Sequence, residues 1–384
     1  MDIIKINDNL NKLFYIGGIV RDELLGRESF DIDITYVGNA IEYCSKFGEV
    51  IQENPDFGTV RVKVTPHLVA SLLSSPSRDE EDSLFSEIIV DFASTRSESY
   101  PHKGHLPVVK KIGCSLREDV MRRDFTVNSL AKSITTGEIV DYTGGLEDLK
   151  NKKLRVLHDN SFIDDPTRIV RGLKFSVRFN FELDEHTKKL QNDYLNNINY
   201  DMSYKRLKKE LIETFNLNSQ KAFEKFINEK IYKLVTPNDI QLPKINIENL
   251  INSHNCENIW LVYVGILGDL SRLPLTKIEQ KIIEDIPQIE PQSDFEICKM
   301  FENCRIETIL LYAITKNEGI AKHYLDDLKQ IKIETTGEDL KTLGIQPSPK
   351  YQQIFDEILK EKLKNPKMSK EDEIKVVKKY DYQN

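Results

Sequence analysis

Residues 15–38 read YIGGIVRDELLGRESFDIDITYVG, and this stretch decides the fold of the N-terminal part. Two adjacent glycines, Gly17 and Gly18, precede a short run of about two helical turns that Gly26 closes. The second half alternates apolar and polar residues and is rich in β-branched side chains, which predicts a strand. The stretch therefore predicts a strand, a glycine turn, a helix and a second strand, as in a mixed α/β domain.

Two acidic residues, Asp31 and Asp33, lie one residue apart on the second predicted strand. Residues two apart on a strand point to the same face, so the two carboxylates stand side by side and repel each other unless a cation lies between them. Mg²⁺ takes carboxylate oxygens and shares its shell with substrate phosphates. An exposed strand can carry such a pair without function, but the preceding glycine turn favours a Mg²⁺ site for phosphoryl chemistry.

The glycine turn fits the same chemistry. Gly17 and Gly18 allow the backbone to approach phosphate oxygens closely, and the following helix offers its N-terminal amides. Arg21 lies one turn into that helix and can reach the same anion. We therefore expect Gly17, Gly18 and Arg21 to bind a nucleotide triphosphate.

The composition limits the other classes of function. The chain has 384 residues and a net charge of −8, so any nucleic-acid binding has to come from local basic patches. The five cysteines have no Cys-x-x-Cys spacing, which argues against a zinc site or a disulfide framework. No apolar run approaches the length of a membrane span, and the N-terminus does not read as a secretory signal, so we expect a cytoplasmic protein without membrane contact.

The character of the sequence changes along the chain. Further strands are expected at 59–65 and 87–94, with a polar acidic surface loop at 74–83 between them. Ser115 and Glu118 form a capping-box pattern at the start of a helix. From Asp165 onward nearly every segment has helical periodicity. We expect a head at 1–150, a helical neck with a base-selecting helix at 151–230, and a helical body and tail at 231–384.

Four motifs in this order resemble those of one family. The stretch GGIVRDELLGRESFDIDIT resembles the head motif of bacterial-type class II tRNA nucleotidyltransferases, the CCA-adding enzymes, whose close relatives are the bacterial poly(A) polymerases. RRDFTVNSLA (122–131), DYTGGLEDLKNKKLR (141–155) and DDPTRIVRGLKFSVRF (164–179) are similar to the later motifs. The resemblance is dense over the first 215 residues. It implies an α+β, polymerase-β-like nucleotidyltransferase head followed by an all-α neck, body and tail.

The second motif supplies further candidate ligands of the nucleotide. Arg122 can meet the triphosphate. The segment is expected to begin a helix, in which Asp124 and Asn128 lie one turn apart and can hydrogen-bond a ribose hydroxyl. Asp91, on the strand at 87–94, is a candidate third carboxylate near the metals, although a structural role is as plausible for it.

The fourth motif carries candidate base-reading residues. Pro166 suits a first helical turn, which places Asp165 and Arg168 at i and i+3 on one face. A carboxylate accepts from an exocyclic amine and a guanidinium donates to a ring nitrogen, a pattern that cytosine and adenine share and that uracil and guanine lack. Each such contact is worth about 1–3 kcal/mol of discrimination. Arg171 is expected to support triphosphate or base, and Lys174 stands where the family usually has Arg.

The resemblance implies an enzyme that adds C and A from CTP and ATP to the 3′ end of tRNA, releasing pyrophosphate, with Asp31 and Asp33 as catalytic metal ligands. Residues 359–380 carry eight Lys against four acids and are expected to bind the tRNA backbone. A partial enzyme that adds only CC or only A, a poly(A) polymerase, and a catalytically inactive RNA- or nucleotide-binding module stay open. Residues 97–119 occupy the region of the family's flexible loop, which governs the extent of addition. The oligomeric state is not predicted.

Overall fold

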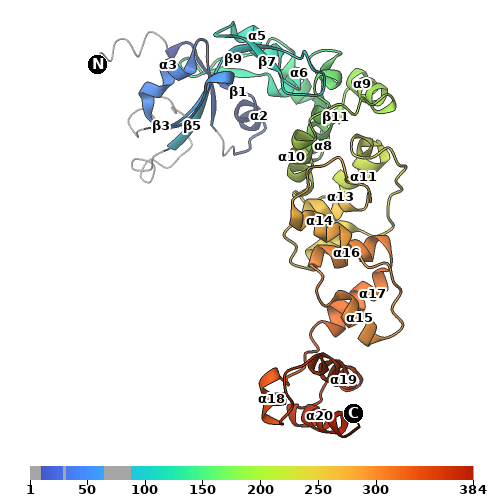
Figure 1. Ribbon diagram of the computed structural model, residues 1–384. Helices are drawn as coiled ribbons and strands as arrows, with labels where there is room; N and C mark the ends of the chain where they lie inside the picture. The colour runs from blue at the N-terminus through green and yellow to red at the C-terminus, as the bar shows by residue number, and fades with distance from the viewer. Residues whose placement is uncertain (1–9, 29–31, 65–87, 384) are drawn as a thin grey trace. The chain divides into compact units, whose positions relative to one another are not determined.

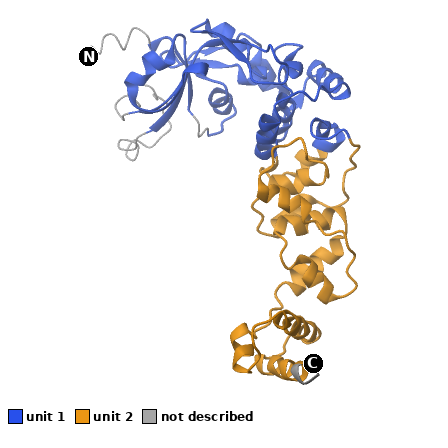
Figure 2. Ribbon diagram, in the orientation of Figure 1, with its two compact units in different colours: residues 1–214, 225–237 blue, residues 215–224, 238–384 orange. Residues whose placement is uncertain are grey.

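The computed structural model describes residues 10–28, 32–64 and 88–383 and divides into two compact units (Figures 1 and 2). The first unit comprises residues 1–214 and 225–237, and the second comprises residues 215–224 and 238–384. The expected acidic loop at 74–83 and the catalytic candidate Asp31 lie outside the described residues.

A seven-stranded mixed sheet forms the centre of the first unit, with strand order β3-β4-β5-β2-β1-β8-β9. The predictions of strands in the glycine stretch, at 59–65 and at 87–94 are confirmed, whereas β3 and the hairpin of β6 and β7 were not predicted. β2 and β5 pair in parallel, and the other strand pairs of this sheet are antiparallel. The bounds are β1 Leu13–Ile16, β2 Asp33–Tyr36, β3 Gly48–Asn54, β4 Thr59–Val64, β5 Ile88–Ser94, β6 Arg96–Ser99, β7 Val108–Ile112, β8 Ala131–Ser133 and β9 Ile139–Val140.

The two faces of this sheet have different roles. Alternation along β4 turns Val60, Val62 and Val64 into the core, where they pack with α3 (Ala40–Cys44) and the 3₁₀ turn Ser45–Phe47. The opposite face is polar and carries Asp33, Arg61 and Asp91. One face of the sheet therefore packs on the core, and the other face presents charged side chains to solvent.

The second motif is less helical than expected. Ser115 and Glu118 form the predicted capping box at the start of α5 (Leu116–Met121). The helix ends before Arg122, and a 3₁₀ turn (Thr126–Asn128) and strand β8 follow. The expectation of a helix through Asp124 and Asn128 was wrong, because the chain must turn there to enter the sheet beside β1. The two side chains still meet, since Asn128 Nδ2 donates to Asp124 Oδ1 at 3.0 Å.

Helices dominate from residue 161 onward, as the periodicity predicted (Figure 1). In the first unit the elements include α6 (Gly145–Lys150), α7 (Ser161–Asp164), α8 (Thr167–Phe179), α9 (Glu185–Asn196), α10 (Tyr204–Phe215), α11 (Gln220–Asn228) and the short strands β10 (Lys153–Leu154) and β11 (Glu182–Leu183); α10 ends, and α11 begins, in residues of the second unit. The second unit contains α12 (Ile247–Asn252), α13 (Ile259–Gly265), α14 (Lys277–Glu284), α15 (Asp294–Phe301), α16 (Ile306–Thr315), α17 (Glu318–His323), α18 (Gly337–Thr342), α19 (Lys350–Lys364) and α20 (Lys370–Gln383). Within the described residues, none of the helices has the length and apolar character needed to cross a membrane.

Candidate active site

A pocket of about 480 Å³ lies over the polar face of the sheet, and we call it the sheet pocket. Asp33 begins β2, and its direct parallel partner on β5 is Asp91, so both carboxylates line the pocket from neighbouring strands. Arg61 on β4 is the cross-strand partner of Asp91 and donates to both of its oxygens, at 2.7 and 2.8 Å. Asp31, the other candidate metal ligand, lies outside the described residues.

The donor chemistry of this face fits a divalent cation. Asp33 and Asp91 offer carboxylate oxygens on an open face, which are the ligands that hard divalent ions prefer. Across residues 10–28, 32–64 and 88–383, no three His, Cys, Asp or Glu residues come together as a metal cluster. A metal held by one or two carboxylates with water and substrate phosphates needs no such cluster.

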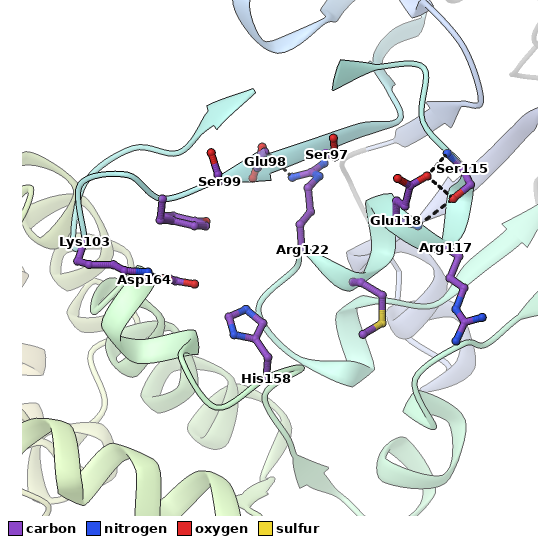
Figure 3. A pocket seen from close by; sticks show the side chains of 12 residues that line it. Ser97, Glu98, Ser99, Lys103, Ser115, Arg117, Glu118, Arg122, His158 and Asp164 are labelled. Atoms are coloured by element: carbon purple, nitrogen blue, oxygen red, sulfur yellow. Dashed lines mark hydrogen bonds and ion pairs between the residues drawn. The ribbon is translucent and has the colours of Figure 1, made fainter. Parts of the chain in front are cut away.

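Besides Arg61, three arginines line the same pocket: Arg96, Arg122 and Arg123. Two acidic side chains with 3% and 0% exposure, Glu98 and Asp119, hold them in place. Arg122 donates to Glu98 at 3.2 Å and to Asp119 at 2.8 Å, as Figure 3 shows for Arg122 and Glu98. Burial favours a raised pKa for Asp119, but Arg123 and Arg122 beside it hold its pKa below the usual range. The carboxylate therefore stays ionised and anchors a cationic wall.

The glycine turn stands next to this wall. Gly17 has φ +75°, and a Cβ on it would lie 3.1 Å from Arg123 Nη1, so the position favours glycine for its backbone and for its neighbour. Gly18 begins α2 (Gly18–Leu24). Arg123 was not among the predicted site residues, although the Arg-Arg pair of the second motif is a signal for it.

Arg21 has a different environment from the one predicted. Its side chain is buried, with Nε donating to Asp22 at 2.8 Å and Nη1 donating to Asn128 at 2.5 Å. Its guanidinium also lies 4.3 Å from the ring centre of Phe179. Among the described residues, Arg21 is not part of the lining of the sheet pocket, and its contacts tie α2 to α8.

An ionic network joins the second and fourth motifs. Arg171 donates to Asp124 at 2.8 Å and to Glu210 at 3.2 Å. Lys174 donates to Glu210 at 3.0 Å and to Glu213 at 2.5 Å, which explains how Lys replaces the family's usual Arg here without an unpaired charge. Burial would raise the pKa of Asp124, but Arg171 and the amide of Asn128 lower it to about 2.

The low pKa of Asp124 predicts an acid-dependent loss of stability. The pKa of Asp124 in the folded protein is about 2, below its ordinary value of 3.8. Its contribution to the free energy of unfolding is therefore present above pH 4 and is lost as the pH falls towards 2. We expect Asp124→Asn to lower the free energy of unfolding by about 2 kcal/mol at pH 6 and to flatten its pH dependence between pH 4 and 2. Urea melts across this range test the expectation. Asp193→Asn, at an exposed position, is the control; an equally steep curve in Asp124→Asn would contradict the prediction.

The base-reading pair is not arranged as predicted. Asp165 precedes α8 in an extended conformation, so it does not share a helix face with Arg168. Its carboxylate accepts from Thr167 and pairs with Arg206. Arg168 donates to Ser161 at 2.7 Å, Tyr100 at 3.2 Å and the carbonyl of Arg122 at 3.0 Å. Pro166 shifts the helix start by one residue, because it acts as the N-cap rather than as a residue inside the first turn.

Arg122 also lines a second pocket of about 490 Å³, which we call the hairpin pocket (Figure 3). Its lining includes Glu98, Tyr100, Lys103, Arg122 and His158. Two backbone hydrogen bonds fix the hairpin loop that borders it: Gly104 N donates to Asp164 O and Ser203 N donates to Gly104 O, both at 3.0 Å. The region expected to correspond to the family's flexible loop is thus bonded to α7 and to the segment before α10.

The Lys-rich tail has fewer available cations than its composition indicated. Lys362 is buried and pairs with Glu373 and Glu334. Lys360, Lys364, Lys370 and Lys375 also form ion pairs with acids. Much of the positive charge of residues 359–380 therefore stabilises the tail itself.

Comparison with known proteins finds relatives along most of this chain. Residues 13–155 match the family described as the poly A polymerase head domain. An A-adding tRNA nucleotidyltransferase of Geobacter sulfurreducens is 28% identical over 98% of this chain and 46% of its own length. Another, from Halalkalibacterium halodurans, is 28% identical over 89% of this chain and 82% of its own. An apo structure of a CCA-adding enzyme covers 98% of this chain and 96% of its own at 24% identity, with a TM-score of 0.77, which shows a shared fold.

Residues 13–155 therefore carry a poly A polymerase head domain, and the fold of the chain is that of the solved neighbour. The predicted α+β head followed by helices is confirmed. This chain is similar to bacterial tRNA nucleotidyltransferases over most of its length. It spans less than half of two A-adding relatives: 46% of the Geobacter sulfurreducens protein and 20% of an Aquifex aeolicus protein that is 39% identical over 48% of this chain.

Proposed function

We propose that this protein is an enzyme that adds C and A from CTP and ATP to the 3′ end of tRNA without a nucleic-acid template. The observation that carries the proposal is the sheet pocket, which Asp33 and Asp91 line together with Arg96, Arg122 and Arg123. Relatives named A-adding and CCA-adding enzymes support it. So do solved neighbours described as complexes with ATP, with CTP and with tRNA.

Each candidate site residue of the head is assigned a role in this reaction. Gly17 and Gly18, with Arg122 and Arg123, bind the triphosphate and neutralise the leaving pyrophosphate. Asp33, together with Asp31, is proposed to hold Mg²⁺, which when bound supplies Lewis-acid stabilisation of phosphate charge. Arg21 stabilises the glycine turn through its hydrogen bond to Asn128.

The neck is proposed to select the nucleotide. Asp165 and Arg168 read the base, and Arg171 and Lys174 support them through their network with Glu210. Asp124 and Asn128, which bond each other, hold the ribose. This assignment divides the chain into the head at 1–150, the neck at 151–230 and the tRNA-binding body and tail at 231–384. A tRNA substrate supports a cytoplasmic location.

Addition of A alone is the second candidate, because relatives that match most of this chain carry the name A-adding. An incorporation assay on three tRNAs separates the candidates. One tRNA lacks CCA, one ends in C and one ends in CC, and each is incubated with one or more labelled nucleotides and Mg²⁺. We expect ordered C, C and A addition with UTP and GTP refused. Activity only on the CC-ending tRNA would assign A addition, a stop after CC would assign CC addition, and long A tracts on unrelated RNA would assign a poly(A) polymerase. No incorporation by folded protein would leave an inactive binding module.

A further inference from the structure

The guanidinium of Arg168, which the proposed function assigns to base reading, is held by three oxygens from separate segments of the first unit. Arg168 lies near the start of α8, and the residue is only 4% exposed. Its Nη1 donates to Ser161 Oγ of α7 at 2.7 Å. Its Nη2 donates to the hydroxyl of Tyr100 at 3.2 Å and to the backbone carbonyl of Arg122 at 3.0 Å. Because Tyr100 directly follows β6, one of these three supports comes from the hairpin of β6 and β7.

Part of this guanidinium remains available to a ligand. The three contacts use three of the five N–H groups that an arginine side chain carries. Among the residues that the structure describes, no group accepts from Nε of Arg168 or from the second hydrogen of Nη1. A single N–H is enough for the acceptor ring nitrogen that cytosine and adenine share. Arg168 therefore presents a free donor on a group whose orientation the protein already fixes.

Tyr100 contacts the guanidinium through both its hydroxyl and its ring. The ring centre lies 5.9 Å from Cζ of Arg168, within the range of a cation–π contact. Burial raises the pKa of Tyr100, so its hydroxyl stays neutral and serves as an acceptor at neutral pH. The loop that follows is anchored through Gly104, whose backbone forms hydrogen bonds with that of Asp164 and that of Ser203. Tyr100 therefore holds Arg168 from a segment that is itself fixed in place.

We propose that Tyr100 is a positioning residue for base selection, which holds Nη2 of Arg168 so that a free N–H of the guanidinium meets the ring nitrogen of cytosine or adenine. The proposal rests on the proposed function, because it takes Arg168 to read the base. Without the hydroxyl, Ser161 and the carbonyl of Arg122 still hold the guanidinium, but Nη2 loses one of its two acceptors. The guanidinium can then turn and offer its donors to the carbonyl oxygens of uracil and guanine. We therefore expect the hydroxyl to act on selectivity rather than on the fold.

Incorporation into a CC-ending tRNA tests this role, with ATP as the correct nucleotide and GTP as the incorrect one. Tyr100→Phe removes the hydroxyl and keeps the ring. We expect it to lower the ratio of kcat/KM for ATP to kcat/KM for GTP about three- to tenfold, as expected for the loss of one hydrogen bond. The KM for tRNA should stay within about twofold. The melting temperature should change little, because the ring still fills its place.

A double-mutant cycle shows whether Tyr100 acts through Arg168. Arg168→Gln removes the guanidinium and should itself lower the ratio for ATP over GTP. If the hydroxyl acts only by holding the guanidinium, adding Tyr100→Phe to Arg168→Gln should lower the ratio no further. Tyr142→Phe is the matched control, because Tyr142 is exposed, precedes α6 and lines neither pocket. It should leave the ratio unchanged.

The outcomes separate failure of the positioning role from failure of the proposed function. An active enzyme in which Tyr100→Phe keeps the selectivity of the unsubstituted protein overturns the positioning role. So does an equal further loss of selectivity in the Arg168→Gln background, because the hydroxyl would then act independently of Arg168. A higher KM for tRNA with unchanged selectivity would make Tyr100 an RNA contact instead. Unaltered selectivity in Arg168→Gln, or an unsubstituted protein that incorporates no nucleotide, contradicts the proposed function itself.

Discussion

Asp33→Asn is expected to lower the rate of nucleotide incorporation about 10³-fold or more, with little change in the melting temperature. The side chain is exposed at the start of β2, on the open face of the sheet, so its loss should leave the core intact. It lines the pocket with Asp91 and the arginine wall, where the proposed function puts the charge that develops during phosphoryl transfer. Loss of one essential catalytic group commonly costs this much or more.

The measurement is single-turnover incorporation of labelled ATP into a CC-ending tRNA at saturating Mg²⁺. Glu53→Gln is a suitable control, because it removes an exposed carboxylate from β3 outside the pocket lining. Asp33→Glu should recover little activity, since the longer side chain moves the oxygens away from the phosphate. A variant Asp33→Asn that retains a tenth of the activity would mean that Asp33 is not essential for catalysis.

The order of elements in the head could be predicted from local sequence because each signal is local. Gly17 and Gly26 bracket α2, and the alternating run after Arg27 predicts β2, without reference to any distant residue. Capping by Ser115 and Glu118 is equally local. The hairpin of β6 and β7 lacked such a signal, because its strands are short and only partly buried.

The contacts of the site residues could not be predicted in the same way, because they join segments far apart in the chain. Arg21 was expected to bind a phosphate. Its side chain contacts Asn128 and Phe179 and is buried between segments far apart in the sequence. The pairing of Arg61 with Asp91 depends on strand register across 30 residues. Asp165 lost its expected helix position because one proline decides where α8 begins.

The second large effect is expected in the tail, from Glu373→Gln. Glu373 is fully buried, pairs with Lys362, and accepts from the backbone amides of Glu334 and Thr335. Burial favours a raised pKa for Glu373, but Lys362 and Thr335 hold its pKa below the usual range, so the ionised form is native. The NH₂ group of a glutamine would face one of the groups that now donate to the carboxylate. The buried ammonium of Lys362 would then be left with Glu334 as its anionic partner. Breaking a buried pair in this way costs about 3–5 kcal/mol.

Hydrogen exchange of residues 334–383 measures this loss where it occurs. A loss of 3 kcal/mol corresponds to about 150-fold faster exchange of the most protected amides around Leu340, Ile354 and Ile358, the core of the tail. Glu371→Gln, an exposed position on the same helix, is the control. Lys362→Met combined with Glu373→Gln should restore part of the protection, because it removes the unpaired charge.

The same variant tests what the tail does. If the tail binds tRNA, its local unfolding should raise the KM for full-length tRNA, while transfer to a short acceptor stem that ends in CC keeps its rate, because the sheet pocket lies wholly within the first unit. Equal loss on both substrates would mean that the tail supports the catalytic part. An unchanged KM for full-length tRNA, with exchange accelerated as expected, would show that the ion pairs of residues 359–380 have a structural role only.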